Sequence, residues 1–185
     1  MTMRSHRPQP PIQKIDDIEV VEHTYDHPDT VRLLMAFYQE QVDRYGFADP
    51  IEADPIEYTH PRGIFVVAYH QGTPAGCGGY RWCEQPTGVI EIKKLYTLSD
   101  ARGLGIGRII LTSLEQHGFQ RGARQAILET GVRNKSAVQL FRSLGYHPTA
   151  PYVADRDPDI NRAYAKSLIS WGMESGPDDL HASIR

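Results

Sequence analysis

The sequence predicts an α/β protein built on a mixed, mostly antiparallel sheet of six or seven strands flanked by about four helices. Three observations support this prediction. Short apolar runs of strand length alternate along the chain with segments whose apolar residues recur at helical spacing. A glycine-rich turn separates the strand-like run Val89 to Leu98 from a helix-like run. The length of 185 residues suits one domain with a sizeable core and is short for two.

Composition limits the classes of function. The chain has the balance of an ordinary soluble globular protein, with 40% hydrophobic and 23% charged residues. A net charge of −3 argues against nucleic acid as the principal partner. No stretch reaches the about 20 apolar residues of a membrane span, and residues 1–11 lack the apolar core of a secretory signal. Cys77 and Cys83 are the only cysteines, which favours a reduced, cytoplasmic setting over a disulfide framework.

The chain is expected to form one folded domain, residues 17–172, between a disordered segment, residues 1–16, and a flexible tail, residues 173–185. The predicted strands cover residues 18–24, 64–69, 75–84, 89–98, 126–130, 146–153 and 162–169.

The predicted helices are delimited by capping residues. The first helix should begin at Asp26 or Asp29 and end at Gly46. The second follows the glycine-rich turn. The third should begin at Asn134 or Ser136 and stop at a glycine.

The predicted strand over residues 89–98 has an irregular pattern. Ile90 and Ile92 define one apolar face, but the next aliphatic residue, Leu95, has the opposite parity. One extra residue at Lys93–Lys94, which is a β-bulge, would restore the alternation. A bulge would bend the strand away from its neighbour and leave backbone groups of residues 95–97 unpaired.

The turn after this strand reads Arg-Gly-Leu-Gly-Ile-Gly over residues 102–107. Glycines let backbone N–H groups approach a ligand, and the start of a helix adds unpaired donors, so the turn suits a pyrophosphate. A Walker loop is excluded because no Gly-Lys-Ser/Thr follows Gly103. A dinucleotide-binding fingerprint is excluded because its third glycine place, counted from Gly103 or Gly105, holds Arg108 or Ile110.

The turn resembles the R-x-x-G-x-G acyl-CoA pyrophosphate loop of the GNAT superfamily of N-acetyltransferases, and the segment Glu91–Thr97 is similar to the central strand of that superfamily. A second signature, N-x-x-A-x-x-L-[YF]-x-x-x-G-[FY], is matched by Asn134, Ala137, Leu140, Phe141, Gly145 and Tyr146. The resemblance covers roughly residues 60–170, and two motifs in order are stronger evidence than a lone glycine loop. It implies the GNAT fold, in which a central pair of strands is splayed apart.

The resemblance also implies that the chain binds acetyl-CoA as a cosubstrate. The residues expected to contact it are Leu95, Tyr96, Thr97, Arg102, Gly103, Leu104, Gly105, Ile106, Gly107, Arg108, Asn134 and Phe141. Backbone amides of residues 103–108 would hold the pyrophosphate, and residues 95–97 would receive the pantetheine arm as an added strand would. Two alternatives stay open: Arg102 is a solvated surface cation, and Asn134 is a plain helix cap.

Glu91 is the candidate catalytic residue, as a general base. It precedes Arg102 by eleven residues, which is the offset of the catalytic glutamate in the histone acetyltransferase branch of the superfamily. Its place in an apolar strand favours a raised pKa and a proton path through water. The alternative is a strand carboxylate paired to Lys93 on the same face.

The general acid is where the sequence departs from the family pattern. Many members carry tyrosine at the position of Phe141, and phenylalanine cannot protonate the leaving thiolate. Tyr96, Tyr146, Tyr152 or water would have to substitute. For each tyrosine taken singly, packing in an aromatic core is the simpler interpretation.

The implied function is transfer of an acetyl group from acetyl-CoA to a primary amine by direct attack in a ternary complex. No metal, nucleic acid or membrane partner is expected, and a homodimer is one assembly that the sequence allows. The acceptor, a small molecule or a peptide, is open, although the acidic stretch over residues 49–57 would suit a cationic amine. The rivals are a non-catalytic CoA-binding sensor, which Phe141 leaves open, and a nicotinamide-dependent domain, which the glycine spacing opposes.

Overall fold

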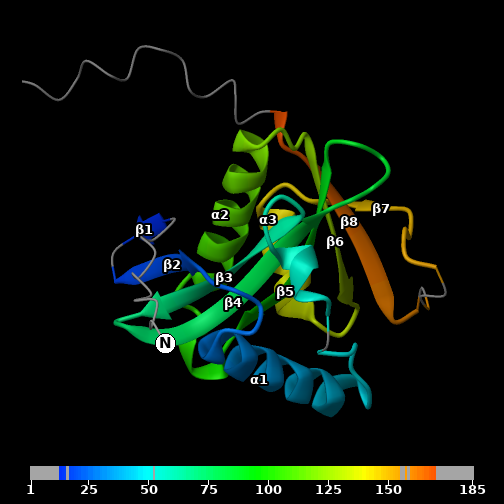
Figure 1. Cartoon of the computed structure of the whole chain (residues 1–185). Coiled ribbons are helices and arrows are strands. Elements are labelled where there is room, and N and C mark those ends of the chain that lie inside the picture. The colour runs from blue at the N-terminus through cyan, green and yellow to red at the C-terminus, as the bar shows by residue number, and fades with distance from the viewer. Residues whose placement is uncertain (1–12, 16, 52, 155–156, 158, 170–185) are drawn as a thin grey trace, which may run out of the picture. The chain divides into compact units, whose positions relative to one another are not determined.

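The computed structural model describes residues 13–15, 17–51, 53–154, 157 and 159–169 (Figure 1). Its strands are β1 (Gln13–Ile15), β2 (Ile18–Glu22), β3 (Gly63–His70), β4 (Thr73–Trp82), β5 (Val89–Thr97), β6 (Gln125–Gly131), β7 (His147–Thr149) and β8 (Asn161–Ser167). Its helices are α1 (Pro28–Tyr45), α2 (Ile106–Gln120) and α3 (Lys135–Ser143), with the short 3-10 helices η1 (Pro55–Tyr58) and η2 (Ser99–Ala101). The fold is α/β, as the sequence predicts.

Hydrogen-bonded strands follow the order β1-β2-β3-β4-β5-β6-β8-β7. β5 and β6 are parallel because the helix α2 connects them, whereas β1 and β2, β2 and β3, β6 and β8, and β7 and β8 pair antiparallel. The prediction of a mixed, mostly antiparallel sheet is confirmed. Among the described residues the sheet has eight strands, one more than the upper figure of the six or seven expected. The strand β1 lies in the segment that we expected to be disordered.

The first of two compact units comprises the described residues within 1–79 and 94–113, and the glycine-rich turn belongs to it. Its core combines side chains from α1, the turn before it, η1 and the strands: Tyr25, Leu33, Leu34, Tyr58, Phe65, Val67, Cys77 and Tyr96. The burial of these side chains is the main favourable contribution to the stability of this unit.

The helix α1 begins and ends at identifiable caps. Its first residue is a proline, which suits this position. The cap is His27, whose Nδ1 accepts from the backbone N–H of Asp29 at 3.2 Å. The prediction that Asp26 or Asp29 caps the helix is wrong, because the Asp29 carboxylate instead accepts from the hydroxyl of Tyr69 at 2.7 Å. The predicted end is confirmed: Gly46 has φ 83.

The second unit comprises the described residues within 80–93 and 114–185. Its buried apolar side chains include Ile90, Leu114, Leu128, Phe141, Tyr146 and Tyr164. The helix α3 begins after Asn134, whose Oδ1 accepts from the N–H of Ala137 at 3.4 Å, and it is followed by Gly145 with φ 85. Both ends are as predicted. The strands β7 and β8 are shorter than the predicted runs.

Part of the predicted domain organisation lies outside the described residues. This holds for residues 1–12 and 16 of the N-terminal segment and for the whole tail, residues 173–185. Within the part of the chain that the structure describes, no helix is both long enough and apolar enough to cross a membrane.

The strand β5 is irregular where the sequence predicts it. Lys94 has φ 55, a left-handed conformation that is uncommon outside glycine. The register between β5 and β6 ends with the pair Ile92 and Leu128, although β5 continues to Thr97 and β6 to Gly131. The predicted break at the lysine pair is therefore present in the backbone.

Candidate active site

The glycine-rich turn exposes main chain at its glycines. Gly103 and Gly105 have φ of 84 and 78, and apart from the adjacent residues no atom lies within 4 Å of the position that a Cβ would take at either glycine. Leu104, between them, is 47% exposed. The helix α2 begins directly afterwards at Ile106, and the first amides of a helix have no acceptor within it. This arrangement suits a bound anion.

The expected catalytic and cofactor-binding residues divide between the two units. Residues 95–97 and 102–108 belong to the first unit, whereas Glu91, Asn134 and Phe141 belong to the second. Within the first unit the structure brings β5 and the turn together, because Gly76 of β4 packs closely on both elements. A Cβ at Gly76 would lie 2.7 Å from the carbonyl oxygen of Tyr96 and 3.0 Å from a methyl group of Ile106.

Arg102 is neither free in solvent nor a simple anion ligand. Its Nη2 donates to the carboxylate of Glu40 on α1, and its Nε donates to the carbonyl oxygen of Thr97 at 3.2 Å. The Thr97 carbonyl is therefore paired, contrary to our expectation for residues 95–97. The reason is that the chain turns back between Thr97 and Arg102. The carbonyl of Lys94, at the irregular position, accepts from the thiol of Cys77 at 3.7 Å.

Glu91 is buried, at 4% exposure, and has two cationic partners. Its Oε2 accepts from Nε of Arg81 at 2.8 Å, and its Oε1 accepts from Nζ of Lys93 at 3.2 Å. Burial on its own raises the pKa of Glu91, but the charge of Lys93 and the hydrogen bond and charge of Arg81 outweigh it and lower the pKa. The expectation of a raised pKa is wrong, and the pairing to Lys93 that we kept as the alternative is present.

The three tyrosines considered as general acids share one property. Burial raises the pKa of Tyr96, Tyr146 and Tyr152, and in each case a neighbouring carboxylate adds to the effect: Glu40, Glu115 and Glu91 respectively. A proton donor works best when its pKa lies near the operating pH. The shift therefore makes each of these hydroxyls a weaker acid than an ordinary tyrosine.

Tyr152 lies in the segment between β7 and β8 and faces the Glu91 site. Glu91 and Glu129 both raise the pKa of its hydroxyl, after the larger effect of burial. Its buried Oη makes no hydrogen bond of standard geometry among the described residues. Tyr152 is therefore a protonated hydroxyl beside an ionised carboxylate, which suits it to orient a water molecule rather than to release a proton.

Phe141 and Asn134 have structural partners in the second unit. Phe141 is 4% exposed, and its ring packs at 5.9 Å from that of Tyr146 and at 6.1 Å from that of Tyr164. The Oδ1 of Asn134 accepts from the hydroxyl of Ser136 at 3.1 Å in addition to its capping bond. Core packing and helix capping thus account for both residues before any ligand is considered.

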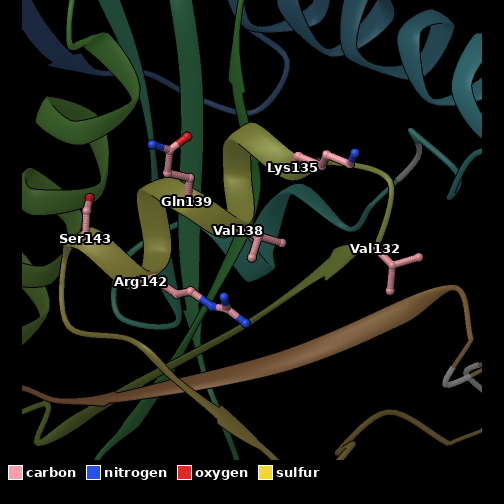
Figure 2. Close-up of a pocket in the computed structure, with 6 residues that line it drawn as sticks. All are labelled: Val132, Lys135, Val138, Gln139, Arg142 and Ser143. Atoms are coloured by element: carbon pink, nitrogen blue, oxygen red, sulfur yellow. The ribbon is translucent and has the colours of Figure 1, made fainter.

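A pocket of about 560 Å³ borders α3, and Figure 2 labels the six residues that line it. Val132 contributes from the loop after β6, and the other lining residues are on the helix: Lys135, Val138, Gln139, Arg142 and Ser143. Lys135 and Arg142 give this pocket positive charge, and its two valines give it an apolar part.

Sequence reasoning missed Arg81 and Glu40. Both act through contacts with residues distant in the sequence, so no motif marks them. Of the acidic stretch over residues 49–57, Asp54 caps η1 by accepting from the N–H of Ile56 at 3.0 Å, and Glu52 lies outside the described residues. The capping role of Asp54 weakens the argument for a cationic acceptor.

Several known proteins are similar to this chain in sequence or in fold. The family model described as "Acetyltransferase (GNAT) family" matches residues 29–146. An uncharacterized N-acetyltransferase of Schizosaccharomyces pombe is 30% identical over 66% of this chain and 79% of its own length. The IAA acetyltransferase of Azospirillum brasilense is 31% identical over 61% of this chain and 76% of its own. A GNAT-family acetyltransferase from Staphylococcus aureus superposes with a TM-score of 0.67, at 18% identity over 82% of this chain and 99% of that one.

The fold and the family match define an N-acetyltransferase. This chain belongs to the acetyltransferase (GNAT) family, and the resemblance inferred from its two motifs is confirmed.

Proposed function

We propose that the chain transfers the acetyl group of acetyl-CoA to a primary amine by direct attack in a ternary complex. The observation that carries the proposal is the turn at Gly103 and Gly105, where exposed main chain at positive φ leads into the start of α2. Backbone N–H groups of residues 103–108 hold the pyrophosphate in this scheme. Residues 95–97 pair with the pantetheine arm, with the Thr97 carbonyl excepted because Arg102 occupies it.

The reaction requires one bond to form and one to break. The amine nitrogen attacks the thioester carbonyl carbon, the C–S bond breaks, and coenzyme A leaves as a thiolate. The amine loses a proton and the thiolate gains one. An amide N–H near Leu95 or Tyr96 is the proposed donor to the oxyanion. No metal ion is needed in this scheme, because the thioester is already activated and main-chain donors meet the negative charge.

Glu91 is the proposed general base, acting through a water molecule. Because its pKa is lowered, the carboxylate is ionised at neutral pH and able to accept a proton, but it is a weaker base than a carboxylate with a raised pKa. We propose Tyr152 as the group that orients this water. Water, rather than Tyr96, Tyr146 or Tyr152, is the proposed source of the proton for the thiolate, since the pKa of each tyrosine is raised.

The acceptor is proposed to be a small molecule or a peptide that carries a primary amine. Arg81 and Lys93 pair with Glu91, and Glu129 adds a second carboxylate near Tyr152, so the two cations are balanced by two carboxylates in this part of the site. This charge balance does not select between a polyamine and an amine that also carries a carboxylate.

The test is release of coenzyme A thiol from acetyl-CoA with a panel of amines, followed by mass spectrometry of the products. The panel includes amino acids, peptides, polyamines and aminoglycosides. Thiol release that requires an amine, with a mass increase of one acetyl group on that amine, supports the proposal. Binding of acetyl-CoA without acetylation of any amine would favour a CoA-binding sensor instead.

A further inference from the structure

Glu40 on α1 lies at the centre of a polar network that reaches the glycine-rich turn. One of its carboxylate oxygens, Oε2, accepts from Nη2 of Arg102, and the other, Oε1, accepts from Nη2 of Arg44. The side chain of Glu40 is 26% exposed and that of Arg102 is 44% exposed. Burial raises the pKa of Tyr96, and the charge of the nearby Glu40 carboxylate adds to this effect. One carboxylate thus links α1 to the first residue of the turn and lies near Tyr96 of β5.

An apolar contact supports this network. The ring of Phe37 lies one helical turn before Glu40 and packs at 5.3 Å from the ring of Tyr96. Tyr96 is itself 8% exposed and belongs to the core of the first unit. This packing holds the helix against the end of β5. A carboxylate on the helix can therefore hold a side chain of the turn in one position.

Arg102 connects Glu40 to the backbone of the turn. Two donors on one edge of its guanidinium make hydrogen bonds: Nη2 donates to the carboxylate of Glu40, and Nε donates to the carbonyl oxygen of Thr97. Between Thr97 and Arg102 lies η2, whose last backbone bond runs from the N–H of Arg102 to the oxygen of Ser99 at 3.3 Å. The position and direction from which the chain enters Gly103 are set by these contacts.

We propose that Glu40 is a positioning residue for the acyl-CoA site, acting by holding Arg102 so that the amides after it are preorganised for the pyrophosphate. This inference rests on the proposed function. It assigns Arg102 to the ordering of the turn rather than to direct charge pairing with the anion. It also makes α1 part of the cofactor site, although no residue of α1 is among those that the family motifs identify.

Two physical effects of removing the Glu40 charge have opposite signs. Loss of a negative charge near an anion site raises the affinity for the anion through long-range electrostatics. Loss of the contact that orders the turn lowers the affinity, because binding must then order the turn. The proposal requires the second effect to exceed the first. The direction of the change in affinity is therefore decisive.

The experiment titrates acetyl-CoA into the full chain by calorimetry for the wild type, Glu40→Gln and Asp43→Asn. Asp43 is a matched control because it carries the same charge on the same helix, and its carboxylate accepts from Gln39 at 2.9 Å. We expect Glu40→Gln to raise the dissociation constant about two- to fivefold, as for other partly exposed ion pairs. Asp43→Asn should leave it unchanged or slightly lower it.

A steady-state measurement and a double variant separate positioning from a general loss of structure. Glu40→Gln should raise KM for acetyl-CoA, and the rate at saturating acetyl-CoA should recover. Arg102→Gln should weaken binding, and adding Glu40→Gln to it should cause no further loss, because both changes remove the same contact. Fully additive losses would overturn the proposal, as would a Glu40→Gln variant that binds acetyl-CoA as tightly as the wild type or more tightly.

Binding of acetyl-CoA by the wild type separates a failure of the proposed function from a failure of the role of Glu40. A wild-type chain that does not bind acetyl-CoA would overturn the proposed function and this inference with it. A wild-type chain that binds acetyl-CoA, with an affinity that Glu40→Gln does not lower, would overturn only the role of Glu40.

Discussion

At the scale of single residues, the most consequential finding is the environment of Glu91. The strand context suggested a carboxylate with a raised pKa, but Arg81 and Lys93 both contact it and its pKa is lowered. Its desolvation is offset by two charge-assisted hydrogen bonds. A base of this kind is always ionised near neutral pH, so its protonation state does not limit the rate there.

Replacement of Glu91 by glutamine tests its role. Glu91→Gln should lower kcat/KM about 10²-fold at pH 7 to 8, because a positioned acid or base typically contributes that much. Lys93→Gln is the control, since it removes one ion pair and keeps the carboxylate, and it should change kcat/KM much less. Full turnover of Glu91→Gln at every pH would remove this residue from the proposed role.

The pH dependence of kcat/KM gives a second test at this scale. Because the pKa of Glu91 lies below its ordinary value of 4.5, protonation of Glu91 should not produce a fall in rate above about pH 5. Any acid limb between pH 5 and 8 should therefore come from the acceptor amine and should shift when the acceptor is changed. An acid limb whose midpoint is the same for every acceptor, and which is absent in Glu91→Gln, would contradict the lowered pKa of Glu91.

Single-residue roles were predictable from sequence only where a local motif determines them. Asn134 could be predicted as a helix cap because a cap is local: its side chain accepts from the N–H of Ala137, only three residues further along. Arg81 was not predicted, because its contact with Glu91 joins two different strands. The contact between Glu40 and Arg102 spans 62 positions and leaves no periodic signal in either segment.

At the scale of elements, the segment that matters most for the proposed function is β5, the glycine-rich turn and α2. The break in β5 at Lys94 and the turn at Gly103 and Gly105 follow from local sequence: a change of parity in the first case and the φ preference of glycine in the second. Both were predictable. β1 was not, because its three residues form a strand only by pairing with β2, and composition alone indicated disorder.

A glycine substitution tests whether the turn binds a ligand. Gly105→Ala should lower the free energy of unfolding by about 1 kcal/mol, since alanine is strained at positive φ. Gly46→Ala is the matched control, because Gly46 has φ 83 and, like Gly105, no atom within 4 Å of its Cβ position. The two variants should lose similar stability, as measured by chemical denaturation, whereas only Gly105→Ala should raise the dissociation constant of acetyl-CoA. Equal affinities would contradict the proposed use of this turn.

At the scale of the whole molecule, two buried carboxylates of the second unit have opposite pKa shifts. Lys93 and Arg81 lower the pKa of Glu91 despite its burial. Burial raises the pKa of Glu115 despite Lys166, whose Nζ lies 2.6 Å from Oε2 of Glu115. No local motif marks Glu115, because its partner Lys166 lies 51 positions away.

The opposite shifts predict opposite effects of pH on stability. Glu91 contributes stability that is present above the unfolded pKa of about 4.5 and is lost as pH falls through the lower folded value. Glu115 contributes stability that is present below about 4.5 and is lost as pH rises through its higher folded value.

Urea unfolding of the wild type, Glu91→Gln and Glu115→Gln between pH 3 and 8 measures these contributions. At pH 7 Glu91→Gln should cost about 1 to 3 kcal/mol, because it weakens the contacts of two cations. The cost of Glu91→Gln should decrease toward acid pH, and the cost of Glu115→Gln should decrease toward neutral pH. If both costs changed in the same direction, the description of the two sites would be wrong.

The central claim is that main-chain amides at the start of α2 hold the pyrophosphate of acetyl-CoA. The most direct measurement is calorimetric titration of the full chain with acetyl-CoA and, separately, with NAD. We expect saturable binding of one acetyl-CoA per chain, competition by free coenzyme A, and no binding of NAD. Absence of acetyl-CoA binding, or tighter binding of NAD, would contradict the claim.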